Sequence, residues 1–191
     1  MRPEISSLAA QDISDAERAG LLFMREEEKL ARDVYRSLGE EWRLPIFSNI
    51  AQSEQTHTEA VQALLVKYDI PDPAVRDVPG VFANPDLQKL YDELMARGGH
   101  SAEEALKVGA LIEDIDLADL EVQIAATDNA DIALVYGNLT RGSRNHLRAF
   151  TKQLAGRGIV YAPVKITQSA YDAIISSERE MGGGVGKQGG R

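Results

Sequence analysis

The sequence predicts an all-α protein whose core is a bundle of four long helices. Four segments of about 24 residues each repeat apolar residues every three to four positions, as amphipathic helices do. Capping sequences, prolines and glycines stand at the ends of these segments. Hydrophobic residues are 43% and charged residues 27% of the 191 positions, which is typical of a globular chain with a buried core.

The first two predicted helices form a hairpin. The first begins at Ser14, where Ser-Asp-Ala-Glu predicts a capping box, and we expect it to end at Leu38, before Gly39. The second begins at Pro45, a favoured first-turn residue, and runs to about Tyr68. A link of about six residues makes the two helices antiparallel neighbours.

The other two long helices form a second hairpin. The third begins at Ser101, in a second predicted capping box, and runs to about Ala126. The fourth follows Asn129 and continues to about Ala155, before Gly156. Because this link is also short, we expect these helices to be antiparallel neighbours as well.

A long crossover joins the hairpins. It spans about 30 residues, too many for a structureless loop in a compact domain. We expect a short helix inside it, opened by Asn84-Pro85 and ending near Arg97. Two hairpins and one crossover are the connectivity of ferritin-like four-helix bundles. A short C-terminal extension follows, with a last helix over 168–177.

The chain is expected to hold one domain. The bundle occupies residues 14–177, preceded by an N-terminal segment, residues 1–13. Residues 178–191 are expected to be a flexible Gly-rich tail, because the last ten residues include six glycines.

Composition limits the function. There is no cysteine, which excludes disulfides, iron–sulfur clusters and thiolate-bound zinc, so any metal must be held by carboxylate and imidazole. The net charge of −9 argues against a nucleic-acid partner. No apolar run has the length of a signal peptide or a membrane span, so we expect a cytoplasmic protein without a membrane partner.

Ionisable residues interrupt the apolar stripe of every long helix near its midpoint. Glu54 and His57 stand in the middle of the second stripe, three residues apart and therefore on one helix face. Glu28, Glu113 and His146 occupy the corresponding places on the first, third and fourth helices. The sequence therefore predicts that carboxylates and imidazoles from four helices meet inside the protein.

Such a cluster needs positive charge. A lone ionised carboxylate in an apolar interior costs several kcal/mol, and like charges nearby add to that cost. Two divalent cations would balance four carboxylates, and the histidines would bind as neutral imidazoles. The predicted metal ligands are Glu28, Glu54, His57, Glu113, the neighbouring Asp116, and His146.

Two segments resemble the metal helices of rubrerythrin-type proteins: EKLARDVY at residues 28–35 and IAQSEQTH at residues 50–57. With VGALIEDIDLADL and GSRNHLRAF, they make the chain similar over 14–177 to a rubrerythrin-like branch of the ferritin-like superfamily, a domain of unknown function. The resemblance implies a ferritin-like bundle with a carboxylate-bridged dinuclear site, usually iron. Manganese uses the same ligand types. No known reaction is implied.

Two positions depart from this pattern or leave it open. Better-known ferritin-like proteins have a second Glu-x-x-His on the fourth helix, where this chain has Ser143 and His146. Either Asp116 supplies the missing oxygen, or a coordination position is open, or one metal site is weak. On the first helix, Glu27 fits the apolar arc nearly as well as Glu28.

Structural roles compete with the metal hypothesis. Glu54 and His57 could form a buried hydrogen-bonded pair, and Glu113 could pair with Arg148. Tyr35 is either a core residue or, close to the metals, a hydrogen-bond donor to a ligand or an electron donor.

Our leading functional interpretation is a di-iron oxidoreductase that acts on O2 or peroxide. The chain has no cysteine for a rubredoxin-like iron centre, so an external electron donor is implied. The alternatives are a non-catalytic metal-binding or iron-handling module, and an interaction scaffold on a degenerate bundle. The sequence leaves the catalytic residues and the oligomeric state open, and a homo-oligomer is compatible with it.

Overall fold

The computed structural model describes residues 8–181 and has six helices and no strand in that range. The helices are α2 (Asp15–Trp42), α3 (Pro45–Lys67), α4 (Pro85–Gly98), α5 (Ala102–Ala125), α6 (Ala130–Ala155) and α7 (Gln168–Ser176). The all-α prediction is confirmed. Residues 1–7 of the expected N-terminal segment and 182–191 of the expected Gly-rich tail lie outside the described residues. Among the described helices, none is long and apolar enough to cross a membrane.

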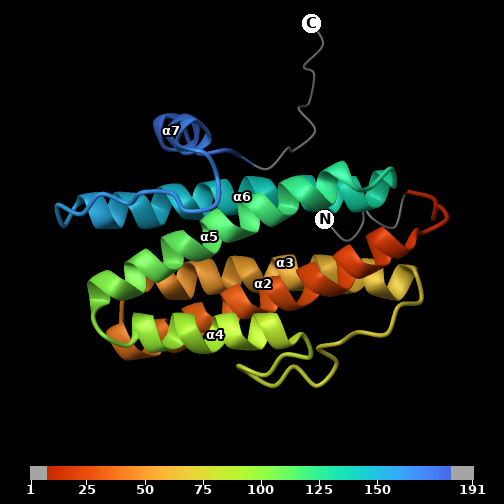
Figure 1. The fold of residues 1–191 in the computed structure, drawn as a ribbon, viewed down its shortest axis with the longest axis horizontal. Helices are drawn as coiled ribbons and strands as arrows, with labels where there is room; N and C mark the ends of the chain where they lie inside the picture. The colour runs from red at the N-terminus through yellow and green to blue at the C-terminus, as the bar shows by residue number, and fades with distance from the viewer. Residues whose placement is uncertain (1–7, 182–191) are drawn as a thin grey trace, which may run out of the picture.

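The four long helices form two hairpins that face each other (Figure 1). One hairpin is α2 with α3, and the other is α5 with α6. Contacts of α2 with α5 and of α3 with α6 close the arrangement, so all four helices surround a common interior. The crossover helix α4 packs against α2 and α5, and α7 packs on α6.

The first hairpin turns later than the sequence predicts. We expected the helix to stop before Gly39, but α2 continues to Trp42 and the link contains only Arg43 and Leu44. Arg43 makes the turn with a left-handed φ of 52°. A Cβ atom on Gly39 would lie 3.1 Å from the Cβ atom of Phe47. Gly39 therefore permits close contact between α2 and α3 instead of ending the helix.

Helix caps tie the hairpins together. The predicted capping box at Ser14 is present, with Glu17 accepting a hydrogen bond from the Ser14 amide at 2.8 Å. Glu17 also accepts hydrogen bonds from Thr127 and Asn129, in the link between α5 and α6. Burial alone would raise the pKa of Glu17, but these hydrogen bonds lower it to about 2. The start of α2 is thus fixed to the second hairpin.

The crossover is fastened to the outer side of α2 by buried charges. The contacts join Arg25 to Asp72, Lys29 to the Val78 carbonyl, Asp33 to the Gly80 amide, Arg32 to Asp77, and Glu26 to the amides of Ala83 and Asn84. Each of these charged side chains has a partner of opposite sign or a hydrogen-bonding partner, which offsets the cost of its burial. These contacts set the rotation of α2 about its axis and leave Glu28 on the inner side.

Two apolar clusters occupy opposite ends of the bundle. One contains Tyr35, Phe47 and Phe150, and the other contains Met24 and Leu139. The helices α2, α3 and α6 each contribute residues to both clusters. Along each of these helices, the predicted ligands lie between the residues of one cluster and those of the other. The polar groups therefore lie in a layer with apolar packing at each end.

The close packing of Gly109 gives a test of this arrangement. A Cβ atom there would lie 2.3 Å from Cε1 of the Phe150 ring, so Gly109→Ala should destabilise the fold by about 1–3 kcal/mol. The control is Gly137→Ala, because Gly137 is exposed, with nothing within 4 Å of its added Cβ. That change should stabilise the helix by about 0.5–1 kcal/mol. Urea unfolding measures both, and equal effects would contradict the packing described.

Candidate metal centre

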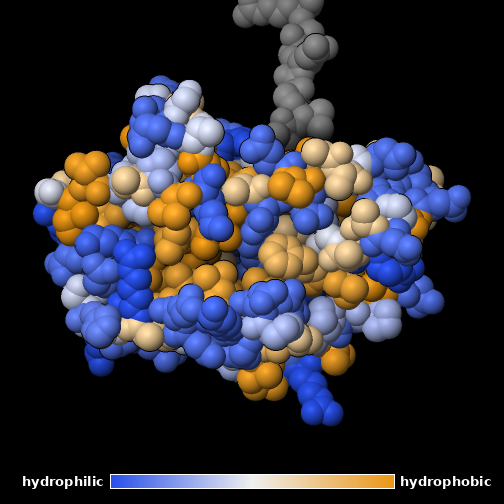
Figure 2. Space-filling model, in the orientation of Figure 1, coloured by the Kyte–Doolittle hydropathy of each residue, from blue (hydrophilic) through white to orange (hydrophobic). Residues whose placement is uncertain are grey.

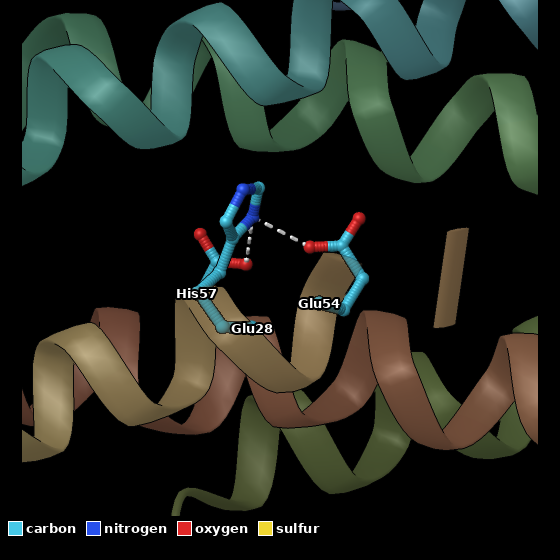
Figure 3. A group of neighbouring side chains, drawn as sticks. All are labelled: Glu28, Glu54 and His57. Atoms are coloured by element: carbon cyan, nitrogen blue, oxygen red, sulfur yellow. Dashed lines mark hydrogen bonds and ion pairs between the residues drawn. The ribbon is translucent and has the colours of Figure 1, made fainter. Parts of the chain in front are cut away.

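Five of the six predicted ligands meet in the middle of the bundle. Glu28 comes from α2, Glu54 and His57 from α3, Glu113 from α5 and His146 from α6. Their exposed fractions lie between 2% and 8%. Figure 3 shows the side chains of Glu28, Glu54 and His57 directed from α2 and α3 toward the opposite hairpin. Helical periodicity predicted buried positions for Glu54, His57, Glu113 and His146, whereas on the first helix it fitted Glu27 nearly as well as Glu28.

The five side chains form two groups that share Glu54. Glu28, Glu54 and His57 have ligand-type atoms within 4.8 Å of one another, and so do Glu54, Glu113 and His146. Glu54 Oε2 lies 2.7 Å from His57 Nδ1, and Oε1 lies 2.8 Å from His146 Nδ1. The two oxygens of the Glu54 carboxylate thus face the histidines of different groups, as the oxygens of a carboxylate that bridges two metal ions face different ions.

The two histidine rings are held in defined positions. Their centroids are 5.7 Å apart, and His57 Nδ1 also lies 3.2 Å from Glu28 Oε2. His146 Nε2 lies 3.0 Å from Ser53 Oγ. In both rings Nδ1 faces the carboxylates, and in His146 the other nitrogen has a hydroxyl partner that orients the ring.

Gly142 of α6 makes room for His57, and sequence reasoning missed it. A Cβ atom at this position would lie 2.5 Å from Cε1 and 2.6 Å from Nε2 of the imidazole. The available signal was an isolated glycine inside a helical pattern, which is unfavourable unless another group needs the space. The absent side chain is therefore part of the site.

Tyr35 contacts a candidate ligand. Its hydroxyl donates a hydrogen bond to Glu113 Oε1 at 2.5 Å, and its ring packs on Phe47 and Phe150. Burial and the Glu113 charge raise the pKa of Tyr35 well above its ordinary value, so the phenol stays neutral. Tyr35 therefore orients the Glu113 carboxylate.

The sixth predicted ligand lies beside the two groups without belonging to either. Asp116 is 5% exposed, and its Oδ2 accepts a hydrogen bond from Ser143 Oγ. Its Oδ1 is buried without a hydrogen-bond partner. Asp116 thus lies next to Ser143, with one carboxylate oxygen free of hydrogen bonds.

The three glutamates of the run 26–28 point in different directions. Glu26 accepts hydrogen bonds from the crossover backbone. Glu28 enters the group with Glu54 and His57. Glu27 is 3% exposed, and burial together with the charges of Asp116 and Asp119 raises its pKa well above the ordinary value. Of Glu27 and Glu28, the structure brings Glu28 to the other ligand-type atoms.

The basic residues near the site are engaged elsewhere. Arg148, a conceivable partner of Glu113, instead pairs with Glu180 at 2.9 Å. The buried cations of α2 bind the crossover, as described above. Over residues 8–181, the carboxylates of the two groups form ion pairs with His57 and His146.

In the metal-free protein, the pKa values of the site reflect its excess of carboxylates over cationic groups. Burial raises the pKa of Glu28 to about 7, although His57 opposes the shift. Burial would lower the pKa of His146, but Glu54 and Glu113 raise it to about 10. The two imidazoles outweigh burial at Glu54 and lower its pKa. Without metal, the site neutralises its carboxylates by taking up protons, which bound divalent cations would displace.

A family model for an uncharacterized protein domain, DUF2202, matches residues 17–178. The chain belongs to the DUF2202 family. The uncharacterized protein MJ0754 of Methanocaldococcus jannaschii is 56% identical over 178 residues, which are 93% of this chain and 96% of that protein. The crystal structure of hypothetical protein MJ0754 from Methanococcus jannaschii is similar, with a TM-score of 0.89 and 55% identity. It covers 91% of this chain and 99% of its own. The expected membership of a domain of unknown function is confirmed, and neither name states an activity for the DUF2202 family.

Glu28 predicts a pH dependence for the metal-free protein. The pKa of Glu28 is about 7 in the folded chain, against an ordinary value of 4.5. Proton binding to Glu28 therefore makes its full contribution to the stability of the fold below about pH 4.5. This contribution declines as the pH rises through 7. Glu28→Gln stays neutral, so its stability relative to the parent should increase by about 1–3 kcal/mol between about pH 5 and 8.

Urea unfolding in the presence of chelator measures this difference. Glu121→Gln, at an exposed position of α5, is the matched control and should show no change with pH. A stability difference for Glu28→Gln that is constant with pH would contradict the description of Glu28 as a buried, partly protonated carboxyl.

Proposed function

We propose that this protein is a ferritin-like dinuclear metalloprotein that binds two divalent ions, iron first and manganese as the alternative. The main observation in favour is that two groups of ligand-type side chains, drawn from four helices, share the carboxylate of Glu54. The connectivity agrees, because two hairpins are joined by a long crossover that contains α4.

The donor set fits these metals. Each group offers carboxylate oxygens and one imidazole, and the chain has no thiolate. Imidazole with carboxylate suits iron and manganese, whereas calcium and magnesium take oxygen ligands alone. Glu28 and His57 would hold one ion, Glu113 and His146 the other, and Glu54 would bridge them. Asp116 is proposed as a further oxygen donor, because its Oδ1 has no hydrogen-bond partner.

Charge balance supports two ions. The carboxylates of Glu28, Glu54, Glu113 and Asp116 bring four negative charges into a layer with buried apolar packing at each end. Two divalent cations neutralise them and leave both histidines as neutral ligands. In the absence of cations the same residues must share protons, as the raised pKa values of Glu28 and His146 indicate.

The reaction we propose is redox chemistry on O2 or peroxide. Two bound ferrous ions would supply one electron each, so that hydrogen peroxide, with two protons, becomes two waters as its O–O bond breaks. Dioxygen that takes two electrons and two protons becomes hydrogen peroxide. A one-electron donor protein would return the ions to the ferrous state. Tyr35 holds the Glu113 carboxylate in place during this cycle, and the apolar clusters limit access of water.

Metal binding without turnover is the second candidate function. The observation that favours it is Asp116, which binds Ser143 and belongs to neither ligand group. The second ion would then have fewer carboxylates. Anaerobic loading with Fe(II), followed by mixing with O2, separates the two functions. Oxidation much faster than that of free Fe(II) in the same buffer supports redox chemistry, and the buffer rate supports a binding module.

Ligand variants should separate the two ions. We expect about two Fe(II) per chain for the parent. Glu28→Gln should weaken one site and Glu113→Gln the other, whereas Glu54→Gln should weaken both because Glu54 belongs to both groups. Anaerobic Fe(II) titration with elemental analysis measures stoichiometry, and exposed Glu121→Gln is the control. A parent that binds much less than one metal per chain would refute the proposal and favour a bundle without metal.

Gly142 gives a second test. Gly142→Ala should displace the His57 ring and lower affinity for the first Fe(II) by about 10- to 100-fold, as changes to residues that orient a ligand do. Gly137→Ala, on the same helix with open space around it, should leave affinity unchanged. Equal affinities for the two variants would show that His57 does not bind metal in the observed position.

A further inference from the structure

Three carboxylates lie beside the candidate metal centre without belonging to either ligand group. Glu27 comes from α2, and Asp116 and Asp119 come from one face of α5, three residues apart. The charges of Asp116 and Asp119 both act on Glu27, and each acts more strongly than the charge of Glu28. The three carboxylates therefore lie close together where α2 contacts α5.

Three oxygen atoms of this cluster are buried without a hydrogen-bond partner. They are both side-chain oxygens of Glu27, which is 3% exposed, and Oδ1 of Asp116, which is 5% exposed. Over residues 8–181, no lysine, arginine or histidine forms an ion pair with Glu27, Asp116 or Asp119. Buried acidic oxygens without partners are costly, so they indicate a place where a positively charged ligand binds.

Two of these carboxylates border a space of the size of one small ion. Glu27 and Asp116 line a pocket whose volume is about 10 Å³ for the centre of a water-sized sphere. Its other walls are aliphatic side chains of α2, α4 and α5, namely Leu30, Ala31, Leu90, Ile112 and Ile115. On the face shown in Figure 2, hydrophobic side chains gather over the strip between α4 and α5. Such a space holds a single ion or a single water molecule.

The charge of the cluster favours an ion over a water molecule. The two metal ions of the proposed function balance four carboxylates, among them Asp116. Glu27 and Asp119 add two further negative charges, which one more divalent cation would balance. A water molecule would donate hydrogen bonds to the unpartnered oxygens but would leave these charges uncompensated.

The ligand type sets the class of cation. The cluster offers carboxylate oxygens alone, whereas each ligand group of the centre includes an imidazole. Oxygen ligands suit magnesium, calcium and manganese, and imidazole suits iron. We propose that Glu27, Asp116 and Asp119 bind a third divalent cation, of this oxygen-preferring class, beside the dinuclear centre. Asp116 would serve both sites, because an ionised carboxylate has two oxygens with several lone pairs.

The test uses Mn(II), whose EPR signal in solution reports the concentration of the free ion. In a titration of chelator-treated protein, Glu27→Gln should bind about one Mn(II) per chain fewer than the parent, because it removes a ligand of the third ion. Glu121→Gln, at an exposed position of α5, is the matched control and should equal the parent. Equal stoichiometry in Glu27→Gln and the parent would overturn the inference and leave a water molecule as the occupant. If circular dichroism shows that Glu27→Gln is unfolded, Asp119→Asn replaces it.

Competition with Mg(II) tests the class of cation. Excess Mg(II) should displace the Mn(II) that depends on Glu27 and leave the Mn(II) bound with His57 and His146 in place. The parent should therefore lose about one Mn(II) per chain and Glu27→Gln none. A parent that loses no Mn(II) would overturn the assignment to an oxygen-preferring cation.

These outcomes are separable from those of the proposed function. Glu54→Gln alters both ligand groups and should keep the Mn(II) that Mg(II) displaces. A stoichiometry that responds to Glu27→Gln but not to Glu54→Gln would refute the dinuclear proposal and leave the third site in place. The reverse pattern would overturn the third site and leave the dinuclear proposal intact.

Discussion

The structure depends on how one buried carboxylate, Glu54, is neutralised. Both of its oxygens face an imidazole, and its side chain is almost fully buried. A charge in this position is tolerated only with compensating charge at close range. The same requirement extends to Glu28 and Glu113, which lie on either side of it. The bundle therefore encloses a site whose stability changes with its protons and, in our proposal, with its metal ions.

The crossover contributes to this arrangement from outside. It engages the cations and one glutamate on the outer side of α2, so that the inner side presents Glu28 to the ligand groups and Tyr35 to Glu113. The charged residues of α2 thus have two roles, attachment of the crossover and contribution to the site. The position of each residue around the helix decides which role it has. Residues that share the outer face bind the crossover, whereas Glu28, rotated about 100° per residue from its neighbours, faces inward. The orientation of the ligand and the attachment of the crossover are consequently one structural feature.

Much of the site was predictable because helical periodicity fixes which face each residue occupies. Glu54 and His57 lie on one stripe, and short links require α3 and α6 to belong to separate antiparallel pairs. The exact end of α2 was not predictable, because Gly39 is needed for contact with Phe47, a tertiary effect. The burial of Glu26 depends on backbone amides almost sixty residues away, which no local pattern shows. The role of Gly142 is likewise visible only once the His57 ring is placed against α6.

The chemistry proposed here requires metal at Glu54. Anomalous scattering at the iron edge, from crystals loaded anaerobically with Fe(II), tests this requirement most directly. Two peaks about 3.5–4 Å apart are expected on opposite sides of the Glu54 carboxylate. One peak should contact Glu28 and His57, and the other Glu113 and His146. Iron found only on the acidic surface, or no peak within coordination distance of Glu54, would contradict it.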